Sequence, residues 1–218
     1  MAAGKDIIIA DTNLNPKTRD KMEAIAKRNG YDLEVQDFTS VPVVQCLRWD
    51  EQRDNSVGRG VILDMFEKYI CKDAPKYDES LPDAVVFDMD GTLCHMNGKR
   101  SPFEWDKVLL DEVDPQVRLL TELYRDASFK IIIFTARDGV CKDLCAEWLD
   151  GYLIDYDALF TRDEGDMRKD YTAKQEMYEK NILGKYNVHC VYDDREQVVL
   201  DVWRRNGFKC MQVGNGCF

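Results

Sequence analysis

Apolar residues in the second half of the chain form short continuous runs, such as "VVF", "IIIF" and "CVY", rather than alternating with polar residues. Continuous runs are typical of strands that helices cover on both faces. They predict five strands, at residues 84–87, 130–134, 158–160, 188–192 and 209–213. The stretches between them predict four helices, at residues 115–126, 140–152, 171–182 and 195–206. This alternation predicts an α/β fold with a doubly wound parallel sheet.

The first 75 residues predict fewer elements. Strands are expected in "KDIIIA" and "YDLEVQDF", and helices from Asn15-Pro16 to about residue 29 and in "GVILDMFEKYI". An irregular stretch that contains arginines lies between the second strand and the second helix. The segment "CKDAPKYDESLPD" is rich in charge and proline and predicts a linker. We therefore expect a small N-terminal α/β segment over residues 1–75 and a larger domain over residues 76–218.

Composition and charge restrict the function classes. The 218 residues are 44% hydrophobic and 33% charged, which suits one α/β domain with a smaller piece. No apolar run approaches the roughly 20 residues of a membrane span, and the N-terminus lacks the apolar core of a signal peptide, so we expect no membrane contact and a cytoplasmic protein. The formal net charge of −11 excludes a large basic surface for nucleic acid. Contact with nucleic acid should involve a short stretch only.

Polar side chains follow four of the predicted strands where each strand ends. Ligands of doubly wound sheets bind outside these carboxyl ends, so the side chains should surround one site. They are Asp88 and Asp90 after the first strand, Thr135 and Arg137 after the second, Thr161, Arg162 and Asp163 after the third, and Asp193 and Asp194 after the fourth.

Paired carboxylates at the ends of buried strands repel each other and need a compensating cation. Oxygen-rich clusters of this kind suit Mg²⁺, which also binds substrate phosphates. A carboxylate nucleophile, a second carboxyl group as acid and base, and the phosphate-binding side chains of Thr135 and Lys174 are the inventory of phosphoryl transfer. The residues therefore predict a reaction through an aspartyl-phosphate.

Four short strings extend this interpretation. "FDMDGTL", "FTAR", Lys174 and "YDDR" resemble, in order, the four motifs of the haloacid-dehalogenase phosphatase superfamily. "DMDGTLCHMNG", "EGDMRKD" and "DDREQVVLDVWRRNGFKCMQV" resemble the 3′-phosphatase domain of the phage polynucleotide kinase–phosphatase family. "DTNLNP" resembles the closing part of that family's kinase domain, so the resemblance covers almost the whole chain.

The resemblance implies a role for each matching residue. Asp88 would attack phosphorus, and Asp90 would protonate the leaving sugar oxygen and then deprotonate water. Mg²⁺ would be held by Asp88, the Met89 carbonyl, and Asp193 or Asp194.

The remaining matches imply phosphate binding. Thr135 and Lys174 would bind the phosphate with Arg137 nearby, and Asp170, one helical turn before Lys174, could orient its ammonium group. The family places an arginine shortly after "MNG", where this chain offers Lys99 at the aligned spacing and Arg100 one residue later. Both alternatives stay open, although only Arg100 could bind phosphate bidentately.

The expected substrate is a nucleic-acid end that carries a 3′-phosphate. About 40 residues separate Asp90 from the second strand of the sheet, so a small flap near residues 94–114 would leave the site open to a polymer. Phe103 and Trp105 on this flap are expected to pack rather than to stack on bases. The alternatives are a small-molecule nucleotidase and a non-catalytic module that binds nucleic-acid ends.

The family's kinase half requires a G-x-x-x-x-G-K-[ST] loop, and no such string occurs in the sequence. Residues 1–75 therefore resemble a kinase segment without its phosphate-binding loop, and we expect no 5′-kinase activity from the chain alone. A companion chain that carries the kinase half and a homo-oligomer are further alternatives.

Overall fold

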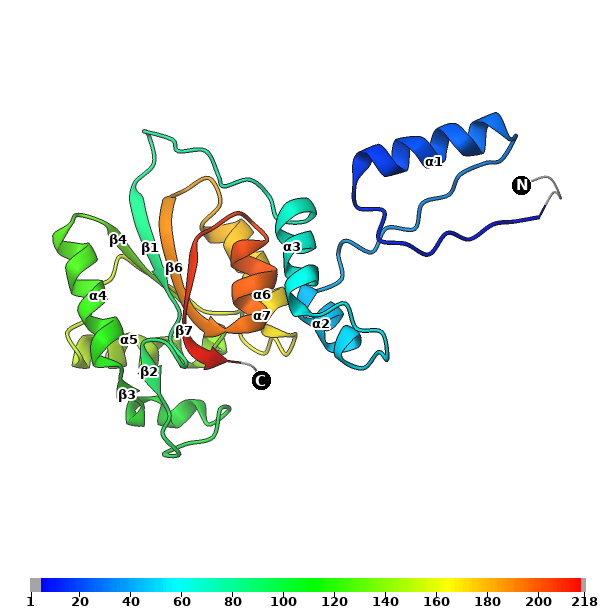
Figure 1. Ribbon diagram of the computed structural model, residues 1–218. Helices are drawn as coiled ribbons and strands as arrows, with labels where there is room; N and C mark the ends of the chain where they lie inside the picture. Colours follow the sequence, from blue (N-terminus) through cyan, green and yellow to red (C-terminus); the bar gives the residue numbers. More distant parts are fainter. Residues whose placement is uncertain (1–4, 217–218) are drawn as a thin grey trace. The chain divides into compact units, whose positions relative to one another are not determined.

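The structure is a computed structural model that describes residues 5–216 of the chain. It divides into two compact units, Met1–Ile70 and Cys71–Phe218, a few residues before the boundary predicted after residue 75 (Figure 1). Within residues 5–216, no helix combines the length and the apolar character that a membrane span requires. The seven cysteines of this range are free thiols.

The larger unit is built on a parallel five-stranded sheet with the order β5-β4-β1-β6-β7. Its strands are β1 (Asp83–Phe87), β4 (Lys130–Phe134), β5 (Ala158–Phe160), β6 (Asn187–Arg195) and β7 (Cys210–Gly216). The predicted doubly wound sheet is thus confirmed. β4 and β5 have the predicted bounds, whereas β6 continues through the acidic residues that were predicted to follow it.

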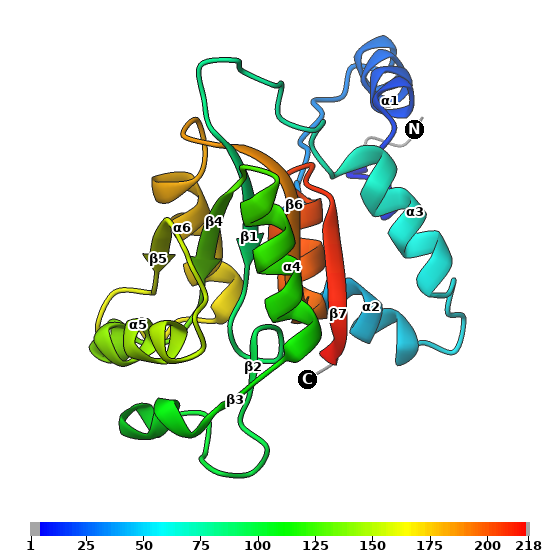
Figure 2. The same cartoon turned by 90° about the vertical axis from the view of Figure 1, so that its left-hand side faces the viewer.

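Helices cover both faces of this sheet (Figure 2). One face packs against α4 (Pro115–Asp126) and α5 (Lys142–Gly151), and the other against α6 (Asp170–Asn181), α7 (Glu196–Val198) and the π-helical segment η3 (Val199–Arg204) that continues α7. Alternate residues of β1 face opposite sides, so that Val85 and Phe87 belong to one core and Ala84 and Val86 to the other. Both sets are buried, which explains why the apolar runs are continuous.

A flap separates β1 from α4. It consists of β2 (Cys94–His95), the 3₁₀ helix η1 (Trp105–Leu110) and β3 (Glu112–Val113), with β2 and β3 antiparallel. Figure 2 shows the flap beyond the carboxyl end of β1. The small flap predicted near residues 94–114 is confirmed.

The predicted linker, residues 71–83, is bound to the larger unit. The Lys72 N–H donates to the Arg205 carbonyl at 2.8 Å, and the Lys72 ammonium donates to the Asn206 side chain at 2.8 Å. Gly207 has φ +84°, and a Cβ there would lie 2.5 Å from the Asp73 carbonyl oxygen. Glycine is therefore required where the chain leaves η3, because this segment passes so close.

The smaller unit contains α1 (Pro16–Arg28), α2 (Val43–Glu51) and α3 (Arg59–Tyr69). α1 begins as predicted, with the Asn15 side chain accepting a hydrogen bond from the Lys17 N–H at 3.0 Å. The two strands predicted in this unit are wrong, since neither residues 5–10 nor residues 31–38 are paired in a sheet. An apolar pattern can make a segment extended, but a strand also needs a hydrogen-bonded neighbour.

The helix α2 lies in the stretch that was predicted to be irregular. Its buried residue Asp50 accepts hydrogen bonds from the Ser56 hydroxyl at 2.7 Å, the Val57 N–H at 3.1 Å and the Gly58 N–H at 2.9 Å. These bonds close the loop between α2 and α3. The charged residues around this helix masked its periodicity in the sequence.

Candidate active site

Asp88 and Asp193 meet because β1 and β6 are neighbours in the sheet. Phe87 pairs with Tyr192, and the Asp88 N–H donates to the Tyr192 carbonyl at 2.9 Å. The residues that follow this pair, Asp88 and Asp193, are therefore neighbours on adjacent strands. The ammonium group of Lys174, from α6, lies 2.8 Å from Asp88 Oδ1 and 2.8 Å from Asp193 Oδ2. All three side chains are buried. The predicted convergence of these residues is confirmed.

Asp194 completes a cluster of three carboxylates. One oxygen each of Asp88, Asp193 and Asp194 lie within 4.8 Å of one another. Gly91, the glycine of the "DGT" string, permits this approach, because a Cβ at Gly91 would lie 2.2 Å from Asp194 Oδ2. Its φ of +78° also favours glycine. The glycine thus has a steric role in the cluster.

The cluster carries more negative charge than Lys174 can balance. Burial raises the pKa of Asp88 well above its ordinary value, although Lys174 opposes this, and Asp193 and Asp194 raise the pKa further. Burial, followed by the charge of Asp193, raises the pKa of Asp194 to about 6. Three buried carboxylates that approach one another this closely fit a hard divalent cation such as Mg²⁺. Asp88, Asp193 and Asp194 are the residues that would hold it.

These pKa shifts predict how stability depends on pH without metal. A carboxyl group whose pKa is raised by folding stabilises the fold while protonated, and that stabilisation is lost as pH rises from about 4 through about 6. Metal-free wild type is therefore expected to lose melting temperature relative to Asp194→Asn as pH rises over this range. Thermal unfolding of both proteins in a chelator at several pH values measures the difference. A difference that stays constant across the range would contradict the prediction.

The Met89 carbonyl, which was predicted to be a metal ligand, accepts hydrogen bonds from the loop after β1. Its oxygen accepts from the Thr92 N–H at 3.1 Å and from the Cys94 N–H at 2.9 Å. These two bonds use both lone pairs of the oxygen. The Met89 side chain is fully buried in the core. The Met89 carbonyl therefore holds the loop after β1, and its role as a metal ligand stays a prediction.

Asp90 is held by two arginines. Arg137 donates to Asp90 from Nε at 2.8 Å and from Nη2 at 2.7 Å, and Arg100 Nη2 donates to Asp90 Oδ1 at 3.1 Å. Asp111 completes the group, accepting from Arg100 Nε and Nη2 at 2.7 Å each and from Arg137 Nη2 at 2.5 Å. We call Asp90, Arg100, Asp111 and Arg137 the arginine–aspartate quartet. Its formal charges cancel.

The quartet revises the role predicted for Arg137. The side chain of Arg137 is fully buried and its guanidinium binds Asp90 and Asp111, so it positions Asp90 instead of lying open to a phosphate. Burial alone would raise the pKa of Asp90, but the charge and hydrogen bonds of Arg137, followed by the charge of Arg100, lower it below its ordinary value. Asp111 was not predicted. Nothing in "LLDEVD" distinguishes it from its acidic neighbours.

Lys99 and Arg100 have different surroundings in the structure. Lys99 forms an exposed ion pair with Glu112 at 2.7 Å, whereas Arg100 is buried and contacts Asp90. Arg100 is therefore the cation of this pair that lies beside the reacting groups, and the one-residue insertion before it is absorbed by the flap.

This difference predicts that substituting Arg100 and substituting Lys99 will have unequal effects on activity. Arg100→Ala should lower kcat/KM by about 100-fold, because one buried cationic donor is lost beside the reaction centre. Lys99→Ala, the matched control, should stay within about twofold of wild type, since exposed ion pairs contribute little. Steady-state kinetics on a phosphorylated oligonucleotide would measure both. Equal losses would show that the two cations share the role.

Thr135 and Asp170 have other partners than predicted. Thr135 is buried at the end of β4, and its hydroxyl accepts from the Arg137 N–H at 3.2 Å. Asp170 pairs with Arg162 through one oxygen and with Arg195 through the other. The Lys174 ammonium contacts Asp88 and Asp193, so the prediction that Asp170 orients it is not supported.

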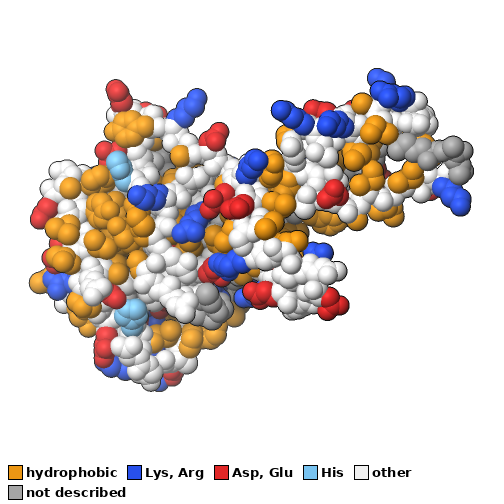
Figure 3. All heavy atoms as spheres, viewed as in Figure 1, with side chains coloured by type: hydrophobic (Ala, Val, Ile, Leu, Met, Phe, Trp, Pro, Cys, Tyr) orange, Lys and Arg blue, Asp and Glu red, His pale blue; other side chains and the backbone are white. Residues whose placement is uncertain are grey.

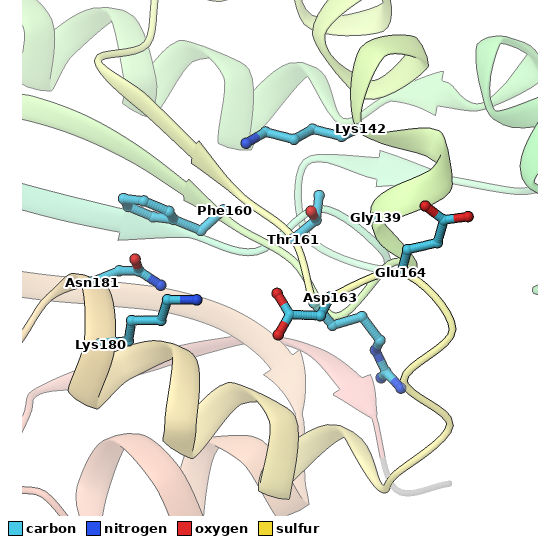
Figure 4. A pocket seen from close by; sticks show the side chains of 9 residues that line it. Gly139, Lys142, Phe160, Thr161, Asp163, Glu164, Lys180 and Asn181 are labelled. Carbon is cyan, nitrogen blue, oxygen red and sulfur yellow. The ribbon is translucent and has the colours of Figure 1, made fainter.

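A cavity lies at the carboxyl end of β5, where Phe160 and Thr161 line it (Figure 4). Its volume is about 460 Å³, and it lies near the start of α5 and the end of α6, where Lys142 and Lys180 line it. Neither Asp88 nor Asp90 lines this cavity. The carboxylate cluster therefore lies outside this cavity.

Surface charge agrees with the sequence-based expectation. On the face drawn in Figure 3, basic side chains lie singly or in small groups among acidic ones. With a formal net charge of −11, this face is unsuited to neutralising a long run of phosphates. The protein would therefore have to recognise the end of a nucleic acid and not a long stretch of it.

Comparison with known proteins agrees with this geometry. The family model for "Polynucleotide kinase PNKP phosphatase domain" matches residues 82–218. A protein of Autographa californica nuclear polyhedrosis virus, described as a bifunctional polynucleotide kinase/RNA ligase, is 28% identical over 205 residues. The match covers 90% of this chain but 29% of the viral protein, so the chain spans under a third of that relative.

Two solved structures resemble the chain over most of its length. One, from the "Structure of Pnkp1/Rnl/Hen1 complex", has a TM-score of 0.63 and 26% identity and covers 90% of this chain and 86% of the other. The second, from the "Structure of the Pnkp1/Rnl/Hen1 RNA repair complex", has a TM-score of 0.64 and 23% identity and covers 100% of this chain and 85% of the other. The second likeness shows a common fold.

Proposed function

Because the chain belongs to the polynucleotide kinase PNKP phosphatase domain family and carries a haloacid-dehalogenase-type phosphatase domain, we propose that it removes 3′-phosphates from nucleic-acid ends with Mg²⁺ through an aspartyl-phosphate. The observation that carries this proposal is the meeting of Asp88, Lys174 and Asp193 beside Asp194 at one sheet edge. The proposed nucleophile, a buried ammonium group and the carboxylates proposed to bind the metal would then act on one phosphate.

Asp88 is the nucleophile of the proposed reaction. One of its oxygens forms a bond to phosphorus while the bond from phosphorus to the sugar oxygen breaks, and water then cleaves the aspartyl-phosphate. Lys174 holds Asp88 in place at 2.8 Å and offers positive charge for the phosphate oxygens. Bound Mg²⁺ would neutralise charge on the carboxylates and on the phosphate. Asp88 would then be ionised at neutral pH despite its burial.

Asp90 is the general acid and base of the proposed reaction. Arg137 and Arg100 keep its pKa low in the free protein against the effect of burial, so it rests as the carboxylate that the water-activating step requires. When a phosphate arrives, its anionic oxygens favour the protonated form of Asp90, which can then donate to the leaving sugar oxygen. Arg100, held by Asp111 and in contact with Asp90, would keep a positive charge beside the phosphate. Thr135 would offer its hydroxyl to the same phosphate.

The small flap supports a polymeric substrate. A flap of about 20 residues after β1 is small for a part of the protein that would have to enclose a free small molecule. The viral relative and the structures of the RNA repair complex are proteins described as acting on nucleic acids or as belonging to an RNA repair assembly. We transfer from them the substrate class, nucleic-acid ends.

Substrate profiling tests this proposal. Oligonucleotides with a 3′-phosphate, the same oligonucleotides with a 5′-phosphate, and nucleoside monophosphates would be compared with and without Mg²⁺. We expect phosphate release from the 3′-phosphorylated ends only, and only with metal. Preference for 5′-phosphates, or equal rates on free nucleotides, would contradict the proposal and favour a nucleotidase.

The N-terminal unit has no proposed chemistry of its own. Residues 1–75 would be a kinase-like segment, and a separate chain with the missing phosphate-binding loop is the partner that this assignment would require for 5′-kinase activity. Mixing the chain with a competent kinase half and labelled ATP would reveal such a partnership.

A further inference from the structure

Phe103 is an aromatic residue that the fold leaves open to solvent. Its side chain is 73% exposed, whereas Trp105, two residues later, is partly buried and packs against the core. The sequence predicted packing roles for both residues. The structure confirms packing for Trp105. Phe103 contacts Trp105 but leaves most of its ring exposed, and so exposed a ring gains little from burial.

A tight turn fixes the backbone of Phe103. The Glu104 N–H donates to the Ser101 carbonyl at 3.2 Å, and the Ser101 N–H donates to the Glu104 carboxylate at 2.7 Å. Pro102 and Phe103 are the central residues of this turn, and proline is favoured at the position that Pro102 occupies. The aromatic ring therefore projects from a rigid support, which lowers the entropy cost of binding through it.

Arg100 connects this turn to the catalytic acid. Its Nη1 donates to the Ser101 carbonyl at 3.1 Å and to the Pro102 carbonyl at 3.3 Å, and its Nη2 donates to Asp90 at 3.1 Å. One guanidinium thus spans from Asp90 to the peptide group that precedes Phe103. Since Asp90 would protonate the leaving sugar oxygen, the sugar and its base belong on the side of the site where this turn lies.

The ring of Phe103 is available for stacking. It contacts Trp105 edge-to-face, with ring centroids 6.0 Å apart and an interplanar angle of 90°. Such a contact orients the ring while its exposure leaves a face uncovered. Stacking on a base is tolerant of sequence and needs no neutralisation of phosphates, which suits a chain of net charge −11.

We propose that Phe103 stacks on the base of the terminal nucleotide and so selects base-bearing ends over simple sugar phosphates. This inference rests on the proposed 3′-phosphatase function and adds its specificity-determining residue. The part of the substrate that Phe103 would recognise is the flat face of the nucleobase next to the phosphate that is removed.

The kinetic test compares two substrates that differ only in the terminal base. Wild-type protein, Phe103→Ala, Phe103→Leu and Phe103→Trp would hydrolyse an oligonucleotide with a normal 3′-phosphorylated nucleotide and one whose terminal sugar lacks a base. Phe103→Ala and Phe103→Leu should raise KM for the normal end by about tenfold and leave the abasic end unchanged. Phe103→Trp should restore the wild-type KM. Leu119→Ala, an exposed apolar substitution on α4, is the matched control and should change neither substrate.

A binding measurement separates this inference from the proposed function. In the Asp88→Asn background, 2-aminopurine at the terminal position of a 3′-phosphorylated oligonucleotide should be quenched on binding, and Phe103→Ala should abolish the quenching. Phe103-dependent quenching without hydrolysis by wild type would sustain the stacking role and overturn the 3′-phosphatase proposal. Equal effects of Phe103→Ala on normal and abasic ends, or no effect on either, would overturn the stacking role alone.

Discussion

Replacing Asp88 by asparagine is expected to abolish phosphate release, with a loss of at least about 10⁴-fold in kcat. The amide keeps the size of the carboxylate but cannot form the acyl phosphate, and it removes a charge from the cluster with Asp193 and Asp194. Lys174 would keep one of its two carboxylate partners, so the fold should be retained. Initial rates on a 3′-phosphorylated oligonucleotide measure the loss.

The control for this substitution is Asp83→Asn, at the opposite end of the same strand. Asp83 is partly exposed and pairs with His189 at 3.8 Å, so the substitution should leave the rate near that of wild type. Acid quenching of wild-type protein with labelled substrate should also trap phosphate on the chain, and Asp88→Asn should trap none. Full activity of Asp88→Asn would falsify the covalent mechanism.

Replacing Asp111 by asparagine should produce the largest loss of stability. Its carboxylate is fully buried and accepts from both Arg100 and Arg137, so the substitution leaves two buried guanidinium groups with one carboxylate between them. Breaking a buried ion pair in this way costs about 3–5 kcal/mol in the free energy of unfolding. Urea unfolding of wild type and variant measures the difference.

Activity should fall in the same variant, because Arg100 and Arg137 would redistribute around Asp90. Asp106→Asn, on the exposed side of η1, is the matched control and should unfold like wild type. A free energy of unfolding for Asp111→Asn within about 0.5 kcal/mol of wild type would show that the quartet is not a stabilising unit.

The parallel sheet and the carboxylate cluster were predictable because both follow from local patterns. Continuous apolar runs mark strands buried on two faces, and parallel strands bring their carboxyl ends to one edge, so Asp88 and Asp193 could be placed together without knowing any contact. The motif resemblance added Lys174, which comes from a helix and has no such positional signal.

Other parts of the site depend on contacts that leave no local trace. Met89 was assigned to the metal by motif, but its carbonyl serves the loop amides, and Asp170 lies one turn from Lys174 yet binds two arginines. In the sequence, Asp111 resembles any surface acid. In the folded protein it is buried and binds Arg100 and Arg137. In the smaller unit, the predicted strands failed since strand pairing depends on a partner that a single segment does not reveal.

The close passage of the segment that contains Asp73 over Gly207 has a consequence for truncated forms of the protein. Similarity to the phosphatase family begins at residue 82, but the contacts of Lys72 and Asp73 lie before that point. A fragment that begins at residue 82 would lack the segment of Lys72 and Asp73 that packs on the end of η3. The Arg205 carbonyl and the Asn206 side chain would lose their hydrogen bonds to Lys72. The smallest intact phosphatase module therefore begins near Cys71, ahead of the region that the family shares.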